Sequence, residues 1–266
     1  MSYQGIVDTL QANNAALSGI LRFTDIEPGV IRELNLNGAY DYCNRVSIVG
    51  FSNDIDVTFS DVGGAFNYDT VGAQLSCVST SAQDAITGTG IQVLYLEGLD
   101  LDYNEIADVV VMNGLTPVLT AQTFLRLKRV RLVQAGSGKT AAGTITLTGD
   151  GFNWITIEPG DYVPLLGRYT VPAGHSLILT HTSLSSGRSG DFEILFMLKG
   201  PGLAEQYASR LLSSRNFVAY ENNALIPEKT DLWFKARRDG GGGGDPRITV
   251  GLDGILFDMN HPDLQS

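Results

Sequence analysis

The stretch of sequence that most constrains the fold is residues 169–199, in which apolar and polar side chains alternate. Residues 176–183 and residues 192–198 each carry mainly apolar side chains at every second position. A period of two is typical of β-strands that bury one face. Between the two segments, residues 185–190 are serine, glycine and arginine, which suit a turn. The stretch therefore predicts a β-hairpin whose two strands pair edge to edge.

The rest of the chain repeats this theme of short strands separated by turns. Its 31 glycines suit tight turns, and 43% hydrophobic content in 266 residues suffices for a large buried core. Because no regular helical crossovers separate the strands, the pattern predicts a mainly β protein, an antiparallel β-sandwich or jelly roll. Further strands are expected at residues 45–51, 75–80, 91–97, 105–112, 123–134, 143–149, 217–220, 232–236 and 247–256.

Two segments have roughly the periodicity of a helix. Residues 1–20 predict a short N-terminal helix, with an extended arm that docks on a neighbour as an equal alternative. Residues 201–214 are the best helix candidate, with a long crossing loop as the alternative. We therefore expect an N-terminal arm or extension over residues 1–40. A sandwich domain follows over residues 41–266, with a division near residue 150 as a further option.

The charge balance argues against several classes of partner. The net charge of −11 disfavours nonspecific binding to nucleic acid or to an anionic membrane. No segment has the pattern of a signal peptide, and no apolar run is long enough to cross a membrane. We therefore expect a soluble protein that is used without export. Charged residues make up only 18% of the chain, which suggests that other subunits cover part of its surface.

No motif in the chain carries a complete catalytic or ligand-binding signature. Residues 136–140 end like a phosphate-binding loop, but a strand is expected to follow where that motif needs a helix. Residues 100–104 resemble the start of a calcium loop without its glycine or its final ligand, so a turn is expected. Cys43 and Cys77 are expected as small buried hydrophobes. The three histidines lack partners at ligand spacing, so no metal, cofactor or catalytic residue is assigned; they are His175, His181 and His261.

One dense basic run stands out in this acidic chain. Its cations are Arg126, Lys128, Arg129 and Arg131. On a regular strand, Arg126 and Lys128 share one face, and the two later arginines share the other with apolar neighbours. Both faces cannot be buried core. Either a bulge shifts the alternation, or one face meets acidic groups. The sharper hypothesis is a subunit contact in which the run pairs with Glu97, Asp100, Asp102 or Glu105 of a neighbouring copy; the simpler one is a solvated face.

A set of turn phrases spans roughly residues 45–258. They are VSTSAQD at 78–84, GTGIQV at 88–93, EGLDLDYNE at 97–105, MNGLTPV at 112–118, AGSG at 135–138, GTIT at 143–146, YTVPAG at 169–174, PEKTD at 227–231 and DGIL at 253–256. This string resembles a family of auxiliary virion structural proteins of tailed bacteriophages, common in cyanophages and other marine phages. The phrases contain no catalytic signature.

The resemblance implies a β-rich particle component without enzymatic activity or cofactor. We expect it in the virion, assembled in the host cytoplasm, with capsid decoration or cementing as the first role and the neck or tail next. The expected partners are further copies of the chain, for which common symmetries favour a trimer, and other virion proteins such as the major capsid protein. Two alternatives stay open. A carbohydrate-binding jelly roll needs Trp154, Trp233 or tyrosines on a concave face, and a glycan hydrolase needs two facing carboxylates.

Overall fold

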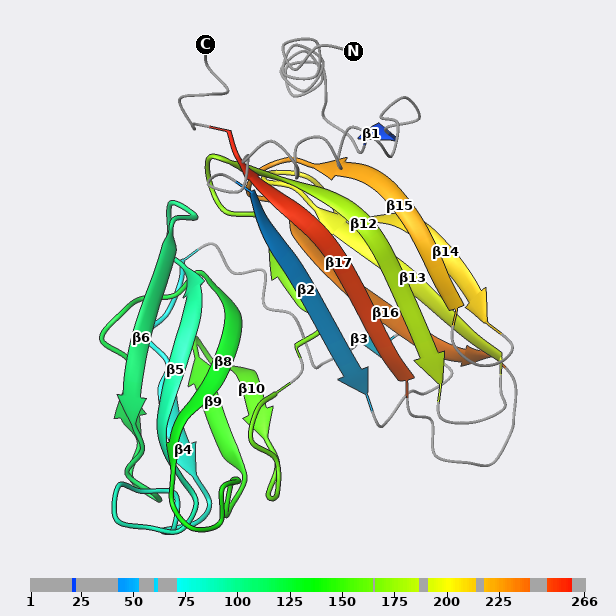
Figure 1. The fold of residues 1–266 in the computed structure, drawn as a ribbon. Helices are drawn as coiled ribbons and strands as arrows, with labels where there is room; N and C mark the ends of the chain where they lie inside the picture. The colour runs from blue at the N-terminus through cyan, green and yellow to red at the C-terminus, as the bar shows by residue number, and fades with distance from the viewer. Residues whose placement is uncertain are drawn as a thin grey trace.

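The computed structural model describes residues 21–22, 43–52, 60–61, 71–164, 166–186, 191–213, 218–239 and 248–259. Within these ranges every regular element is a β-strand, and every pairing between strands is antiparallel. The strands form two β-sandwiches (Figure 1). The predicted mainly β class is therefore confirmed. The helix or arm expected over residues 1–20 lies outside the described residues. Of the arm or extension expected over residues 1–40, the structure describes only β1 (Leu21–Arg22).

The larger sandwich consists of two facing sheets. One has the strand order β1-β15-β12-β17-β2, and the other has the order β11-β16-β13-β14 with β3 also paired to β16. Its strands after β1 are β2 (Cys43–Ser52), β3 (Ser60–Asp61), β11 (Arg168–Thr170), β12 (His175–Ser186), β13 (Asp191–Lys199), β14 (Gln206–Ser213), β15 (Val218–Ile226), β16 (Asp231–Asp239) and β17 (Ile248–Asp258).

The order of these strands defines a jelly roll. Strands β2, β12, β15 and β17 lie in the first sheet, and β3, β13, β14 and β16 lie in the second. The chain therefore changes sheet at every connection among these eight strands except that between β13 and β14. Eight antiparallel strands wound in this way form two Greek keys, which is the jelly-roll arrangement. The fold class predicted from the alternating sequence is confirmed.

The smaller sandwich is inserted into the edge of the jelly roll. Its sheets have the orders β10-β9-β4-β7 and β6-β5-β8. The insertion begins after β3 and ends at β11, and both of these strands pair with β16 along the edge that β13 leaves free. Its strands are β4 (Ser76–Ser79), β5 (Ile91–Leu99), β6 (Glu105–Val111), β7 (Val118–Leu119), β8 (Arg126–Ala135), β9 (Ile145–Gly149) and β10 (Phe152–Ile157).

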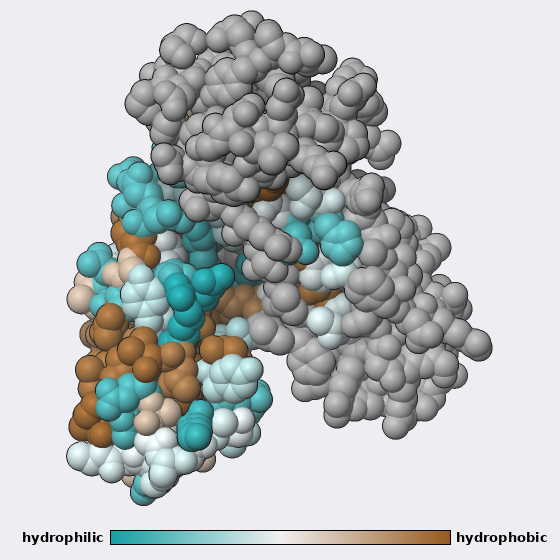
Figure 2. Space-filling view, in the orientation of Figure 1, coloured by the Kyte–Doolittle hydropathy of each residue, from teal (hydrophilic) through white to brown (hydrophobic). Residues whose placement is uncertain are grey.

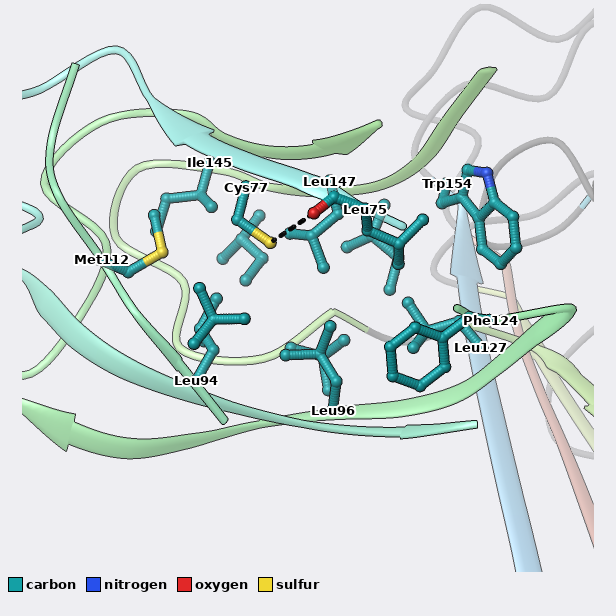
Figure 3. Close-up of a cluster of buried hydrophobic side chains, with 14 of the residues drawn as sticks. Leu75, Cys77, Leu94, Leu96, Met112, Phe124, Leu127, Ile145, Leu147 and Trp154 are labelled. Atoms are coloured by element: carbon teal, nitrogen blue, oxygen red, sulfur yellow. Dashed lines mark hydrogen bonds between the residues drawn. The ribbon is translucent and has the colours of Figure 1, made fainter. Parts of the chain in front are cut away.

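Each sandwich has its own hydrophobic core. In the smaller one, Leu94 and Leu96 of β5 point toward Ile145 and Leu147 of β9, with Cys77 among them (Figure 3). Burying each such large side chain contributes about 1.5–3 kcal/mol. The cluster of the smaller sandwich runs from Ala73 to Leu166 and that of the jelly roll from Tyr169 to Leu256. The chain therefore passes from one hydrophobic core to the other between residues 166 and 169, whereas the sequence suggested residue 150 as the boundary between two parts of the domain.

The hairpin expected over residues 169–199 does not form. Strand β12 pairs with β15 and β17, while β13 pairs with β14 and β16 in the opposite sheet. The predicted alternation itself is confirmed, because Leu177 and Leu179 join the same buried cluster as Phe196 and Leu198. Two apolar faces that follow one another in the sequence are buried equally well when they face each other across a sandwich. Alternation determines which face of a strand is buried, but it does not determine which other strand pairs with it.

The helix predicted over residues 201–214 is wrong for its larger part. Residues 206–213 form strand β14, which pairs with β13. Helical spacing in one segment is a local preference, and pairing along β13 supplies backbone hydrogen bonds over the whole segment instead. The other strands expected from alternation are confirmed with shifted ends, as β2, β4, β5, β6, β8, β9, β15, β16 and β17.

Candidate interaction surface and the junction between the sandwiches

The basic run lies on β8, at one edge of the three-stranded sheet β6-β5-β8. On a regular strand, Arg129 and Arg131 would share a face with apolar neighbours, and a β-bulge removes this conflict. Gly98 of β5 pairs with Leu127 and Glu97 pairs with Arg129, so Lys128 is an extra residue on β8. The bulge shifts the alternation, and Leu127 and Val130 both point into the core. This was one of the two resolutions that the sequence left open, and the structure confirms it.

Arg126 turns away from the rest of the run and into the junction with the jelly roll. Its guanidinium donates two hydrogen bonds to the carboxylate of Asp231 on β16, at 2.9 Å from Nε and 3.0 Å from Nη2. Both side chains are only 4% exposed. The Thr170 hydroxyl donates a further hydrogen bond of 2.7 Å to the same carboxylate. The acidic partner expected on a neighbouring subunit is therefore, for Arg126, a residue of its own chain.

Other polar contacts cross the same junction. The backbone N–H of Ala173 donates to the Tyr103 carbonyl at 2.9 Å, and Arg168 donates to the Trp154 carbonyl at 2.6 Å. Two cations lie over rings of the opposite sandwich, Lys128 over Tyr169 at 4.8 Å and Lys229 over Tyr103 at 5.8 Å from the ring centre. These contacts join side chains and backbone of both units, so the insertion is docked on the jelly roll and is not merely tethered to it.

Burial at the junction also changes the acidity of two tyrosines. Burial raises the pKa of the Tyr169 phenol well above its ordinary value of 10.0, and the nearby carboxylate of Glu105 raises it further. Burial likewise raises the pKa of Tyr103, and the positive charge of Arg126 partly offsets that effect. Both phenols therefore stay protonated under ordinary conditions and serve as ring surfaces for the two lysines.

The outward face of sheet β6-β5-β8 carries exposed valines. Val109 and Val111 of β6 are 56% and 49% exposed, and Val133 of β8 is 60% exposed. Between them lie Val93 and Tyr95 of β5, which pair with Val111 and Val109 respectively. Figure 2 shows hydrophobic surface gathered on the lower part of the smaller sandwich. We call these five residues the apolar face.

Charged side chains continue the same face toward the jelly roll. Glu97 of β5 forms ion pairs with Arg129, at 3.7 Å, and with Arg131. Lys128 pairs with Glu105 of β6. The sequence named both carboxylates as partners of the basic run, but the pairs form within one chain. Arg129 and Arg131 keep about half of their surface exposed, so a subunit contact through β8 stays a prediction.

The motifs weighed in the sequence have structural roles. The Asp100 carboxylate accepts hydrogen bonds from the backbone N–H groups of Asp102, at 2.9 Å, and Asn104, at 2.8 Å, which closes the expected turn. Lys139 is followed by strand β9, as expected, where a phosphate-binding loop would need a helix. Within the described ranges, no cluster of three or more histidines, cysteines or acidic residues could hold a metal ion.

Three buried carboxylates form hydrogen bonds and ion pairs within the chain. Asp84 accepts hydrogen bonds from the Ser79 hydroxyl and from the backbone N–H groups of Ile91, Ala142 and Gly143. Glu193 forms an ion pair with Arg237, and Asp231 forms one with Arg126. The sequence missed Asp231, because no local signal links two residues that lie 105 positions apart. The only signal in the sequence was the position of Arg126 between Leu125 and Leu127, which indicates that its guanidinium needs a buried acidic partner.

Comparisons with known proteins add little. No protein-family model matches the sequence, and no curated protein matches it. A solved structure of the Gx strain of infectious bursal disease virus aligns over 84% of this chain and 74% of its own, with 10% identity and a TM-score of 0.28. The VP2 subviral particle of that virus aligns over 85% and 75%, with 11% identity and a TM-score of 0.25. The fold assignment rests on the strand order alone. No helix in the described residues is long and apolar enough to cross a membrane.

Proposed function

We propose that this protein is a non-enzymatic structural component of a tailed-bacteriophage virion, and specifically a capsid decoration or cement protein. The observation that carries the proposal is the apolar face of sheet β6-β5-β8. Soluble monomers rarely leave a contiguous apolar patch uncovered, and such patches mark sites of protein association. In the virion this face contacts other copies of the chain or other particle proteins such as the major capsid protein.

The architecture supports a role in assembly. A jelly roll places its loops and sheet edges at the surface, where they are free for lateral contacts. The buried ion pair of Arg126 and Asp231 joins the smaller sandwich to the jelly roll. The apolar face therefore keeps a fixed orientation relative to the jelly roll. The resemblance of the turn phrases to auxiliary virion proteins of tailed phages points to the same role.

The alternative of a carbohydrate-binding module is weakened by its tryptophans. Trp233 is buried in the jelly roll, and Trp154 is buried in the smaller sandwich with its indole N–H donated to the Gly149 carbonyl at 3.2 Å. Neither ring is free to stack on a sugar. The hydrolase alternative gains no support either, because Asp84, Glu193 and Asp231 are each committed to structural donors.

The test is to locate the protein in purified particles of the phage that encodes it. An antibody raised against the recombinant chain would be detected by immunogold electron microscopy, and mass spectrometry of the same particles would give the copy number. We expect label over the head and many copies per particle. Label confined to the neck or tail would overturn the decoration role while keeping the structural one. Particles that lack the protein altogether would overturn the virion assignment.

A further inference from the structure

Strands β3 and β11 lie end to end along one edge of β16. Asp61, the last residue of β3, pairs with Lys235. Arg168, the first residue of β11, pairs with Trp233. Both strands are antiparallel to β16, so they run in the same direction. Only Phe234 lies between the two paired positions, and the two ends that flank the insertion are therefore separated by about 7 Å, the rise of two residues along a strand.

The alternation of side chains also continues from one strand to the other. Tyr169, the second residue of β11, points into the jelly-roll core, and so does Phe234 of β16. Successive residues of a strand point to opposite sides, so a residue placed opposite Phe234, directly before Arg168, would point into the same core. In the sequence, Asp61 is followed by an apolar residue, Val62. One apolar residue between Asp61 and Arg168 would thus make β3 and β11 a single continuous strand.

Counted as a single strand, β3 and β11 complete the jelly roll. Beside the short β1, one sheet then has the order β15-β12-β17-β2, and the other has the joined strand followed by β16, β13 and β14. These are the eight strands of a jelly roll. Strands β4 to β10 add to neither sheet, because their pairings, over the described residues, join them only to one another (Figure 1).

Packing within each sandwich is separate as well. The two core clusters share no residue, and each takes its members from one sandwich alone. The junction between them includes the buried ion pair of Arg126 and Asp231. Removing the whole insertion would open this junction to water, so Asp231 would regain its hydration and would not be left as a buried, unpaired charge. The jelly roll therefore loses no part of its own core together with the insertion.

We propose that the smaller sandwich is a self-contained binding module that interrupts one edge strand of the jelly roll, and that the jelly roll folds without it. The binding role rests on the proposed function, because the apolar face lies entirely on β5, β6 and β8 of the insertion. The jelly roll is then a carrier that fixes the orientation of the module, and the module makes the contact with the particle.

Hydrogen exchange in the full chain tests whether the two sandwiches are separate folding units. Leu94 and Leu177 are both fully buried, one in each core. In the variant Leu94→Ala, amide hydrogens of β5 and β9 should exchange at least about 30-fold faster, whereas those of β12 and β17 should keep their wild-type rates. The matched variant Leu177→Ala should show the reverse pattern. Faster exchange in both sandwiches from either variant alone would mean one cooperative unit and would overturn the inference.

A shortened chain tests the split strand itself. Deleting residues 63–167 joins Val62 to Arg168 and keeps the one apolar residue that a continuous strand needs. We expect this chain to be soluble, to show the circular dichroism of β-sheet and to unfold cooperatively on heating. The control deletes residues 62–167, which joins Asp61 directly to Arg168 and shifts the register by one residue. The control should unfold at a lower temperature. Equal Tm values would contradict the register, and a shortened chain that retains Val62 but does not fold would refute the proposal.

The module and the virion role fail separately. Phage that makes the folded shortened chain in place of the full chain should yield particles without it. A shortened chain that enters particles would overturn the binding role of the insertion and keep the virion function. A full chain that is absent from purified particles would overturn the virion function and keep the split strand and the independent jelly roll.

Discussion

Replacing Arg126 with methionine would show how strongly the two sandwiches are joined. Methionine keeps most of the apolar stem of arginine and removes only the guanidinium. The change deletes the two hydrogen bonds to Asp231, at 2.9 and 3.0 Å, and leaves that carboxylate with the Thr170 hydroxyl as its remaining side-chain donor. Because Asp231 is 4% exposed, water cannot replace the lost cation.

The expected loss follows from this burial. Removing one partner of a buried ion pair typically costs about 3–5 kcal/mol, because the other charge stays desolvated. A chain of this length loses roughly 2–4 °C in Tm per kcal/mol, so the expected decrease is about 6–20 °C. The matched control is Lys235→Met on the same strand, which breaks the more exposed pair with Glu205 at 3.0 Å. That change should cost less than about 1 kcal/mol.

Thermal and urea unfolding followed by circular dichroism would measure these differences. A double-mutant cycle with Asp231→Asn isolates the pair, because the double variant contains neither charge. We expect the double variant to be more stable than the sum of the two single losses implies, with a coupling of at least about 1.5 kcal/mol. A loss below about 1 kcal/mol for Arg126→Met, or strictly additive single losses, would refute the idea that this pair holds the junction.

Three further outcomes are expected in the smaller sandwich. Asp84→Asn replaces one of the two carboxylate oxygens with an NH2 group, so two of the four hydrogen bonds lose their acceptor, and it should lower the free energy of unfolding by about 1–3 kcal/mol for each donor left unpaired, measured in urea. Burial, helped by the charge of Asp108, raises the pKa of the Cys77 thiol from 9.0 to about 12, so thiol reagents should label it only after unfolding. Because the folded state holds that proton more tightly, Cys77 contributes stability that is complete below about pH 9. It should be lost at about 1.4 kcal/mol per pH unit as the pH rises toward 12, a slope that Cys77→Ala would flatten. Gly98→Ala would place a methyl group against the Arg126 carbonyl oxygen and the Phe124 ring. We expect the free energy of unfolding to fall by more than about 2 kcal/mol, or the protein to fail to fold, which would be seen as a reduced soluble yield. A Gly98→Ala protein as stable as the wild type would contradict this close approach.

The sequence by itself determined the β class, most strand positions and the buried face of each strand. Alternation is a local property, because successive side chains on a strand point to opposite sides whatever the strand pairs with. The same logic exposed the conflict on β8, where a regular strand would have buried arginines with leucines. The bulge at Lys128 resolves that conflict, and sequence reasoning had named a bulge as one of its two resolutions.

Only the tertiary structure decided which strands pair and which charges meet. Residues 176–183 and 192–198 have the pattern of a hairpin, yet they face each other across the jelly roll, because one apolar face buries another equally well in either arrangement. Residues 206–213 became a strand because β13 offers them backbone partners that a helix would not use. Arg126 meets Asp231 because the insertion begins and ends beside the same edge of β16, a closeness in space that no local pattern in the chain encodes.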